Sequence, residues 1–343
     1  MTPRRAKLRD ELVTLAHGAG GKATQTLVDA LFLQELANPT LAALGDAALV
    51  EIDGVRLAFT TDAYVVKPLF FPGGDIGELA VNGTVNDLAV SGARPLALAA
   101  GFVLEEGYPV ADLRRIAASM GRAASAAGVA VVAGDTKVVE RGKADGLYVT
   151  TAGVGSLGPE VELGPERIRA GDRVLVSGTI GDHGTAVLVA RGELALEVDL
   201  ESDSAPVHEL AGALLRLGGA LRCMRDPTRG GVATALNELA AAADLAVSLD
   251  EAALPLRPEV AGTCEILGID PLYVACEGRL LAFVAPEHAE HALALLRKHP
   301  TGAGAAIIGD VREEPRGMVL LQTALGGTRI VDVLVGDPLP RIC

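Results

Sequence analysis

The feature that most restricts the fold of this chain is a regular alternation between short apolar runs and longer segments with helical periodicity. In the first half, the short runs predict buried strands, and the longer segments, with apolar residues three or four positions apart, predict helices. The predicted strands cover 55–61, 96–104, 129–133 and 147–154, and the predicted helices cover 76–91 and 110–127. This order predicts a mixed α/β domain.

Two glycine-proline pairs within 156–170 separate this part from a second one of the same style. They predict a linker, and therefore an N-terminal domain over 1–158 and a C-terminal α/β domain over 159–334. In the second part, the predicted strands cover 173–177, 245–250, 280–285 and 305–311, and the predicted helices cover 183–191, 206–218, 231–243 and 286–298.

Composition and charge exclude several classes of function. The formal net charge is −14, so the surface does not attract nucleic acid or anionic membranes, whose sequence-independent binding depends on Lys and Arg. No stretch approaches about 18 uninterrupted apolar residues, and the charged N-terminus lacks the apolar region of a secretory signal. We therefore expect a cytoplasmic protein that holds any polyphosphate ligand locally, through backbone N–H groups or a metal ion.

Five aspartates form the first set of candidate site residues: Asp46, Asp62, Asp87, Asp135 and Asp226. An aspartate beside a glycine is ordinary turn chemistry, and that is the better interpretation of any one of them alone. Asp62 and Asp135, however, directly follow apolar strands, and ligands usually bind at strand ends in α/β proteins. Carboxylates are also the hard oxygen ligands that Mg²⁺ prefers, so the set together predicts a site for Mg²⁺ and phosphate.

Three glycine-rich loops offer backbone N–H groups to an anion: AHGAGG at 16–21, FPGGD at 71–75 and DPTRGG at 226–231. Gly230 and Gly231 lie at the start of a predicted helix, a position that favours phosphate. The chain contains no GxxxxGK[ST] motif, and no GxGxxG lies between a strand and a helix. A P-loop or a Rossmann site therefore has no support.

Lys137 and Glu277 are candidate acid/base groups. Lys137 follows Asp135 by two residues, and Glu277 lies in ACEGR just before a predicted strand. A lysine and a glutamate near a polyphosphate could clamp its charge or transfer protons. From the residues alone, a surface ion pair is the better interpretation.

The last nine residues, 335–343, have two prolines and no periodicity, which predicts an extended, flexible tail. Pro338 and Pro340 prevent this tail from folding back as a helix or a strand, so Cys343 becomes an exposed thiol on a semi-rigid arm. The other three cysteines are expected to be small buried residues. The alternative for Cys343 is a ragged terminus that ends in cysteine by coincidence.

The chain resembles the HypE family of hydrogenase maturation factors over nearly its whole length. The resemblance rests on AHGAGGK, TTDAYVVKPLFFPGGDIGELAVNGTVNDLAVSGARP, GDTKVV, RDPTRGG and the terminal PRIC, which occur in this order. The wider PurM-like superfamily includes aminoimidazole ribonucleotide synthetase, selenophosphate synthetase and thiamine monophosphate kinase.

This resemblance implies a fold and a reaction. The fold has two α/β domains, and the N-terminal domains of two subunits pair in a homodimer to form a shared β-barrel, with ATP and Mg²⁺ near the interface. A partner carbamoyltransferase, HypF, places a carbamoyl group on the terminal cysteine, and the enzyme uses ATP to dehydrate that group to a thiocyanate. The cyano group then passes to iron on the HypC–HypD complex for a nickel–iron hydrogenase.

The resemblance also implies roles for residues. Those implied to hold Mg²⁺ are Asp46, Asp62, Asp87 and Asp226, and those implied to bind ATP are Gly20, Gly21, Lys22, Asp62, Asp87, Asp135, Thr136, Asp226, Gly230 and Gly231. Lys137 and Glu277 would help to deprotonate the carboxamide nitrogen on Cys343. Family members often show GDDAAV around the first aspartate, whereas this chain reads GDAALV and has one carboxylate fewer there.

Two rival functions remain open at this point. One is a superfamily enzyme that acts on a free small molecule, which would have no use for a thiol on the tail. A selenophosphate synthetase would carry a reactive cysteine near its N-terminus, and this chain has none before Cys223. The other rival is a non-catalytic ATP-binding scaffold whose tail only docks a partner, and ATP consumption that depends on carbamoylated Cys343 would exclude it.

Overall fold

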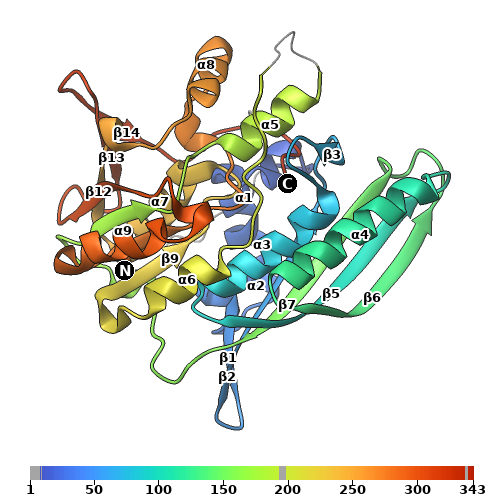
Figure 1. Ribbon diagram of the computed structural model, residues 1–343, viewed down its shortest axis with the longest axis horizontal. Coiled ribbons are helices and arrows are strands. Elements are labelled where there is room, and N and C mark those ends of the chain that lie inside the picture. Colours follow the sequence, from blue (N-terminus) through green and yellow to red (C-terminus); the bar gives the residue numbers. More distant parts are fainter. Residues whose placement is uncertain (1–7, 9, 193–197, 337–338) are drawn as a thin grey trace.

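Two mixed β-sheets with helices packed against them form the core of the protein (Figure 1). The computed structural model describes residues 8, 10–192, 198–336 and 339–343. The prediction of an α/β fold with strands and helices in alternation is confirmed.

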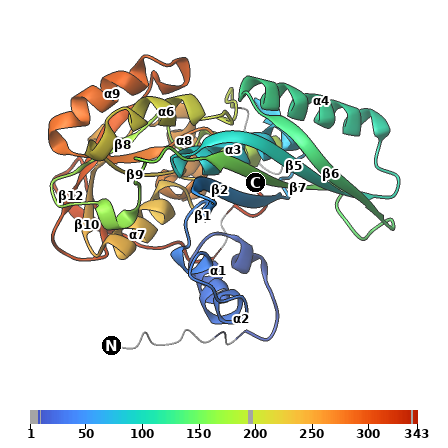
Figure 2. The ribbon, with the colours of Figure 1, turned by 90° about the horizontal axis from the view of Figure 1, so that it is seen from below.

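The first sheet has the strand order β1-β2-β7-β5-β6, and only β5 and β6 run parallel. Its strands are β1 (Ala48–Ile52), β2 (Val55–Tyr64), β5 (Arg94–Glu105), β6 (Ala130–Val139) and β7 (Leu147–Ser156). Two helices, α3 (Ile76–Val90) and α4 (Val110–Ala126), lie on one face of this sheet (Figure 2). Side chains alternate between the faces of a strand, so Tyr64, Leu98 and Val149 point to the helices and form a core with them.

The other face of the first sheet, which we call the uncovered face, lies away from α3 and α4 (Figure 2). Large apolar side chains are exposed on it: Val50, Ile52, Val55 and Phe59. Phe59, for example, is 51% exposed although it lies in the middle of a ten-residue strand. Contiguous apolar surface of this kind marks a site of protein association.

The second sheet has the strand order β14-β13-β10-β12-β8-β11-β9. Its strands are β8 (Arg173–Val176), β9 (Leu221–Arg225), β10 (Ala246–Asp250), β11 (Leu281–Val284), β12 (Ala306–Arg312), β13 (Val319–Gln322) and β14 (Thr328–Val331). Helix α7 (Gly231–Ala243) packs on one face, and α6 (His208–Leu215) with α9 (Ala289–Arg297) packs on the other. The central strands are consequently buried on both faces, which explains why their sequences are continuous apolar runs.

Helix α3 joins the two halves of the molecule. Ala89 and Val90 at its end belong to the same buried cluster as Leu210 and Leu214 of α6. Residues 157–172 connect the two sheets, and they include the short 3-10 turn Pro165–Arg167. The remaining helices of the second half are α5 (Asp182–Ala190) and α8 (Pro258–Leu267).

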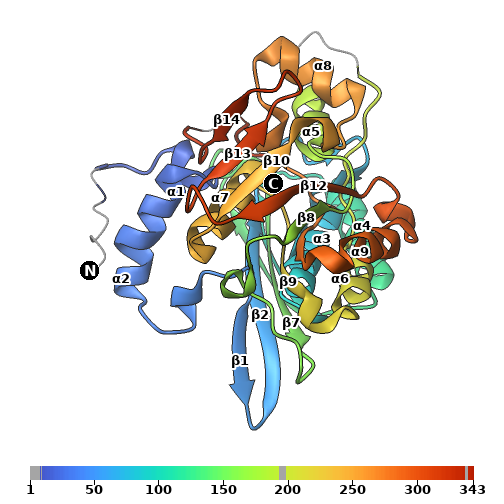
Figure 3. The same ribbon diagram turned by 90° about the vertical axis from the view of Figure 1, so that its left-hand side faces the viewer.

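The N-terminal segment differs from the prediction, which gave only a glycine-rich loop at 16–21. A 3-10 turn covers Leu15–Gly18, and α1 (Lys22–Leu27) starts directly after the glycines and continues through a π-helix, Val28–Phe32, into α2 (Leu33–Glu35). The start of α1 contacts the segment that follows β14, because the N–H of Lys22 donates to the carbonyl of Leu334 at 3.0 Å (Figure 3). No helix among the residues described is long and apolar enough to cross a membrane.

Candidate functional site

Three carboxylates from three different elements meet where the two halves of the molecule join. Asp46 precedes β1, Asp87 lies on α3, and Asp226 follows β9. One carboxylate oxygen of each lies within 4.8 Å of the others. The structure therefore brings together three of the five aspartates that the sequence singled out.

Neighbouring side chains hold this cluster of three aspartates in place. The hydroxyl of Thr60 on β2 donates to the carbonyl of Asp46 and to Oδ2 of Asp87, each at 2.8 Å. Arg225 forms an ion pair with Asp46 and a second one, at 3.3 Å, with Glu238. One cation is thus close to three carboxylates, which leaves negative charge uncompensated.

The electrostatics of the cluster favour a bound cation. Burial raises the pKa of Asp87 and of Asp226 well above its usual range, and the charges of neighbouring carboxylates raise both further. Burial also raises the pKa of Asp46, although Arg225 opposes that shift. Three hard oxygen donors that are costly to ionise without a counter-ion fit Mg²⁺.

Asp62 lies next to the cluster without being part of it. It is on the face of β2 that points to α3, and Oδ2 accepts a hydrogen bond from the hydroxyl of Tyr64 at 3.0 Å. Its negative charge contributes to the raised pKa of Asp87 and of Asp226, so it acts on the same small volume.

Glu277 is a buried carboxyl group at the edge of the same volume. Its side chain is only 2% exposed, and its Oε1 has no hydrogen-bond partner among the described residues. Burial, followed by the charges of Asp226, Asp203 and Asp62, raises the pKa of Glu277 well above its usual range. An unpartnered buried carboxyl is costly, and such groups are typical of sites that exchange protons with a ligand.

Two residues that the sequence analysis missed fix the backbone of Glu277. Oδ1 of Asp203 accepts a hydrogen bond from the N–H of Glu277 at 3.0 Å, and the amide of Asn86 on α3 donates to its carbonyl at 3.1 Å. Asn86 also accepts from the N–H of Val207 at 2.8 Å. For Asn86, the only signal in the sequence was its position one residue before Asp87 in TVNDLA.

Two of the three predicted glycine-rich loops, at 16–21 and 226–231, lie around this volume. Gly230 and Gly231 have φ of +76° and +60° and lead into α7, so they present the helix N-terminus that the sequence predicted. Gly20 has φ of +79°, and a Cβ atom there would lie 3.0 Å from Cβ of Arg229. Lys22 points elsewhere, since its Nζ pairs with Asp332 at 3.0 Å.

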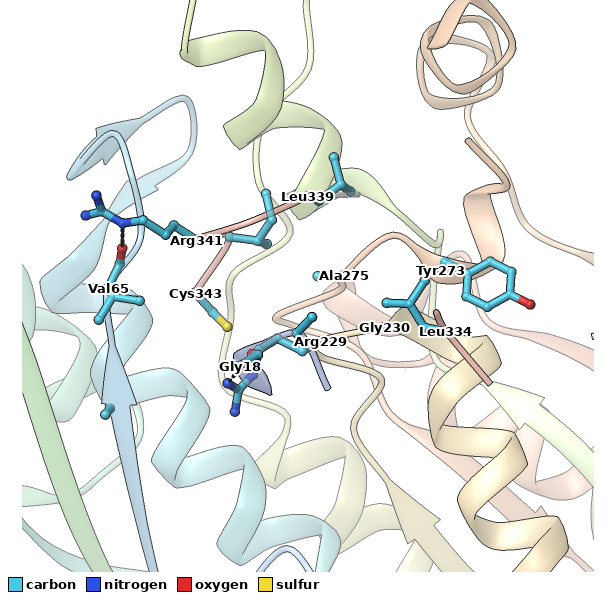
Figure 4. A pocket seen from close by; sticks show the side chains of 13 residues that line it. Gly18, Val65, Arg229, Gly230, Tyr273, Ala275, Leu334, Leu339, Arg341 and Cys343 are labelled. Carbon is cyan, nitrogen blue, oxygen red and sulfur yellow. Dashed lines mark hydrogen bonds between the residues drawn. The ribbon is translucent and has the colours of Figure 1, made fainter. Parts of the chain in front are cut away.

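The end of the tail lies in an open pocket beside these loops (Figure 4). Cys343 is partly buried there, and Arg229 and Gly18 line the same pocket. The sequence predicted an exposed thiol on a free arm, whereas the structure docks residues 339–343 against the body. Pro338 lies outside the described residues. The other three cysteines are buried, as predicted.

Arg229 is a further residue that the sequence analysis quoted in DPTRGG but did not single out. Figure 4 shows the sulfur of Cys343 pointing toward Arg229. Nη1 of Arg229 donates to the carbonyl of Gly18 at 3.0 Å, so the residue connects the N-terminal glycine loop with the end of the tail. The negative charge of Cys343 is the largest of the effects that raise the pKa of Arg229.

Asp135, Thr136 and Lys137 lie on β6, away from the cluster. Asp135 pairs across the sheet with Gly101, which pairs with Thr150, which pairs with Ala63. Three strand spacings of about 4.8 Å therefore separate Asp135 from β2.

The pairing also sets the face of these side chains. Ala63 follows Asp62, so Asp135 and Lys137 share the uncovered face of the first sheet, opposite the face that carries Asp62. Both are exposed, and Lys137 Nζ forms an ion pair with Asp135 at 2.6 Å. The structure of one chain does not bring Lys137 to Glu277.

Two protein families match this chain. Residues 44–157 match the AIR synthase related protein, N-terminal domain, and residues 169–322 match the AIR synthase related protein, C-terminal domain. Together, the two matches cover both sheets.

Similar proteins match the chain over nearly its whole length. A carbamoyl dehydratase HypE of Rhodobacter capsulatus is 56% identical over 339 residues, which are 98% of this chain and 99% of that protein. A solved HypE–HypF complex is 45% identical with a TM-score of 0.86, covering 90% of this chain and 99% of that one. A solved HypE in complex with ATP is 46% identical with a TM-score of 0.81, covering 97% and 100%.

Proposed function

The chain belongs to the HypE carbamoyl dehydratases of the AIR synthase related family. We therefore propose that the carbamoyl group that this enzyme dehydrates is attached to its own Cys343. The protein is an ATP-dependent carbamoyl dehydratase of hydrogenase maturation. The observation that carries the proposal for Cys343 is the position of the tail, which ends in the pocket beside Arg229 and the glycine loops.

The chemistry requires a better leaving group than an amide oxygen. Transfer of the γ-phosphoryl group of ATP to the carboxamide oxygen creates a phosphate leaving group. Loss of that phosphate and of two N–H protons leaves the thiocyanate on Cys343, so the oxygen of the carbamoyl group ends in inorganic phosphate. The work of the protein is then to position the groups and neutralise their charge.

Asp46, Asp87 and Asp226 would hold Mg²⁺, and Asp62, whose charge acts on two of these carboxyl groups, would complete the set. A bound Mg²⁺ would supply charge neutralisation for the phosphates of ATP. The residues fit that ion because they offer three carboxylate oxygens within 4.8 Å of one another, with little cationic compensation.

The backbone would hold the nucleotide. Gly230 and Gly231 lie at the start of α7, where a helix N-terminus favours phosphate, and Gly20 and Gly21 lie in the loop that Arg229 contacts. Asp135 would take part only from the uncovered face of the sheet, whereas the side chain of Thr136 lies on the opposite face.

Glu277 is the group of the described chain best placed to accept a proton. Its Oε1 has no hydrogen-bond partner among the residues that the structure describes, and its backbone is fixed on both sides, by Asp203 and by Asn86. Its raised pKa moves it toward the working pH, where an acid/base group is most effective.

The protein would act as a homodimer through the uncovered face of the first sheet. That face exposes Phe59, Val55 and Ile52, and pairing two such faces would form a shared barrel. Asp135 and Lys137 lie on the same face, so Lys137 would serve the site of the partner subunit. The division of labour would follow the predicted domains, with 1–158 for dimerisation and ATP, 159–334 completing the site, and 335–343 as the tail.

The partners follow from the same family membership. A HypE–HypF complex has been solved for a protein 45% identical to this one, and we propose the same carbamoyltransferase partner here. Transfer of the cyano group to the HypC–HypD complex and a cytoplasmic location complete the proposal.

Intact mass spectrometry tests this function. The purified protein is incubated with the carbamoyltransferase, carbamoyl phosphate and ATP, and peptide mapping locates the change. We expect one carbamoyl group on Cys343, followed by loss of one water only when the ATP is hydrolysable. The Cys343→Ala variant is the matched control and should stay unmodified while still binding ATP. An unmodified Cys343 in the presence of an active transferase would overturn the proposal.

A further inference from the structure

The end of the tail pairs with the body as a short strand would. The N–H of Val65 donates to a main-chain carboxylate oxygen of Cys343 at 3.0 Å, and the N–H of Lys67 donates to the carbonyl of Arg341 at 3.1 Å. The paired residues advance by two on one side and retreat by two on the other, which is the pattern of an antiparallel addition just beyond β2. Backbone pairing of this kind fixes the register of a bound peptide.

Arg341 is held through its side chain as well. Its Nη1 lies 2.5 Å from Oδ2 of Asp145, and its Nε donates to the carbonyl of Val65 at 2.9 Å. Asp145 also pairs with Nζ of Lys67 at 2.9 Å. Asp145 thus binds the guanidinium group of Arg341, the third residue from the chain end.

Ile342 is held by burial and by its carbonyl. It is 5% exposed and packs in the cluster that contains Tyr64, Val66 and Phe71. Its carbonyl accepts a hydrogen bond from Nε2 of His183 at 2.9 Å. His183 is completely buried, and burial lowers its pKa to about 4, so at neutral pH it is a neutral ring that donates through Nε2.

The docked backbone is not a relaxed one. Arg341 has φ of +55°, a region that residues other than glycine rarely adopt. Arg191 donates from Nη2 to the carbonyl of Arg341 at 3.0 Å and contacts that of Pro340 as well. Such a conformation persists only where surrounding contacts hold it, which indicates a built site and not a chance resting place of the tail.

We propose that residues 65–67, Asp145 and His183 form a peptide-binding groove that selects a chain end reading Arg-Ile-Cys and docks it in one register. The backbone of 65–67 sets the register, Asp145 selects the arginine, and the apolar cluster selects the isoleucine. The fixed register then delivers the sulfur of Cys343 to Arg229. The importance of that delivery rests on the proposed function, whereas the groove itself does not.

The reactivity of the Cys343 thiol measures how firmly the tail is docked, and it requires no enzymatic activity. The other three cysteines are buried, so the alkylation rate of the native full-length protein reports Cys343. We expect Arg341→Ala and Asp145→Ala each to raise that rate by roughly three- to tenfold, as expected for loss of a partly exposed ion pair with charge-assisted hydrogen bonds. The double variant should react no faster than the faster single variant, because both substitutions break one contact.

Matched variants separate the groove from other effects. Ile342→Ala should raise the rate at least as much, and it alters only the penultimate residue, so the body stays folded. Lys67→Met removes the other cation at Asp145 but keeps the backbone N–H, and its rate should stay within about twofold of the parent.

Three results would overturn the groove. They are an unchanged rate in Arg341→Ala, a double variant whose effect equals the product of the single effects, and a Lys67→Met effect as large as that of Asp145→Ala. Failure of the dehydratase proposal would show instead in the mass spectra, with these alkylation rates unaffected.

Discussion

Replacing Asp87 with asparagine should make the metal-free protein more stable and remove its response to Mg²⁺. Asparagine keeps the shape of the side chain and can still accept the hydrogen bond from Thr60, which is 2.8 Å long. It removes one of three charges whose oxygens lie within 4.8 Å of one another. At that separation, two unit charges repel by about 3.5 kcal/mol with an effective dielectric constant of 20.

The net gain is smaller than the sum of these repulsions. Arg225 compensates part of the charge on Asp46, and raised pKa values keep part of the cluster protonated. We therefore expect Asp87→Asn to raise the unfolding free energy in EDTA by about 1–3 kcal/mol, or Tm by at least about 2 °C.

The sign of the pH dependence follows from the direction of the pKa shifts. Folding raises the pKa of Asp87 and of Asp226 above the ordinary 3.8, so protonation of these groups stabilises the folded state at low pH. That stability is lost as the pH rises through the raised values. The difference in Tm between Asp87→Asn and the parent in EDTA should consequently grow from about pH 5 to about pH 8.

Thermal unfolding of both proteins, with EDTA or with excess MgCl₂, measures the difference in stability, its dependence on pH and the response to Mg²⁺. The parent should be stabilised by Mg²⁺ most at the higher pH, and Asp87→Asn hardly at all. Asp135→Asn is the control, because this exposed carboxylate lies on the other face of the sheet and should change Tm little. An Asp87→Asn variant that is less stable than the parent in EDTA at about pH 8, or that keeps the full Mg²⁺ response, would refute the reasoning.

Three further predictions concern the reaction and the assembly. Glu277→Gln should let carbamoylated Cys343 accumulate in the mass spectrum without loss of water, because the buried proton acceptor is gone; normal dehydration would exclude that role. Phe59→Asp should turn the proposed dimer into a monomer in sedimentation experiments, since it places a charge on the uncovered sheet face, and an unchanged mass would assign the dimer to another surface. A mixture of Lys137→Ala and Glu277→Gln subunits, each inactive alone, should recover about a quarter of the parent activity, because half of the random dimers contain one intact site of two; no recovery would place the pair within one subunit.

The sequence predicted most of the elements because periodicity and glycine punctuation report them directly. The predicted strands and helices of the first sheet appear where expected, with β6 as the main exception in length, but strand β1 was missed. The prediction stopped at residue 133 because Gly134-Asp135 reads as a turn, whereas pairing with β5 carries the strand to Val139. Pairing with the neighbouring strand here outweighed the low strand propensity of glycine and aspartate.

Some missed elements had readable signals. The hairpin of β1 and β2 turns at Asp53-Gly54, both with positive φ, and an Asp-Gly pair between apolar runs is a strong hairpin signal. Helix α8 begins with Pro258 and ends before Gly268, the usual order for these two residues at helix ends.

The candidate site was predictable as a set of residues but not as an arrangement. Asp46, Asp87 and Asp226 each stand out in the sequence, yet only the packing of α3 against both halves shows that they converge while Asp135 does not. Asn86 and Asp203 act through the backbone of Glu277, and a contact between residues so distant along the chain leaves no local pattern. The docked tail was missed for the same reason, because its partners lie at 65–67, 145 and 183.

The pairing of the tail with its own body makes the acceptor and the catalyst one molecule. Its occupancy of the pocket is an intramolecular equilibrium, set by the chain between Val331 and Cys343 and equivalent to a local concentration in the millimolar range. As long as the proposed dimer stays assembled, the dehydration step should therefore be first order and independent of protein concentration, with one turnover for each loading of the thiol. A compound that competes with the tail would have to bind tightly enough to displace a ligand at that local concentration, however dilute the protein is.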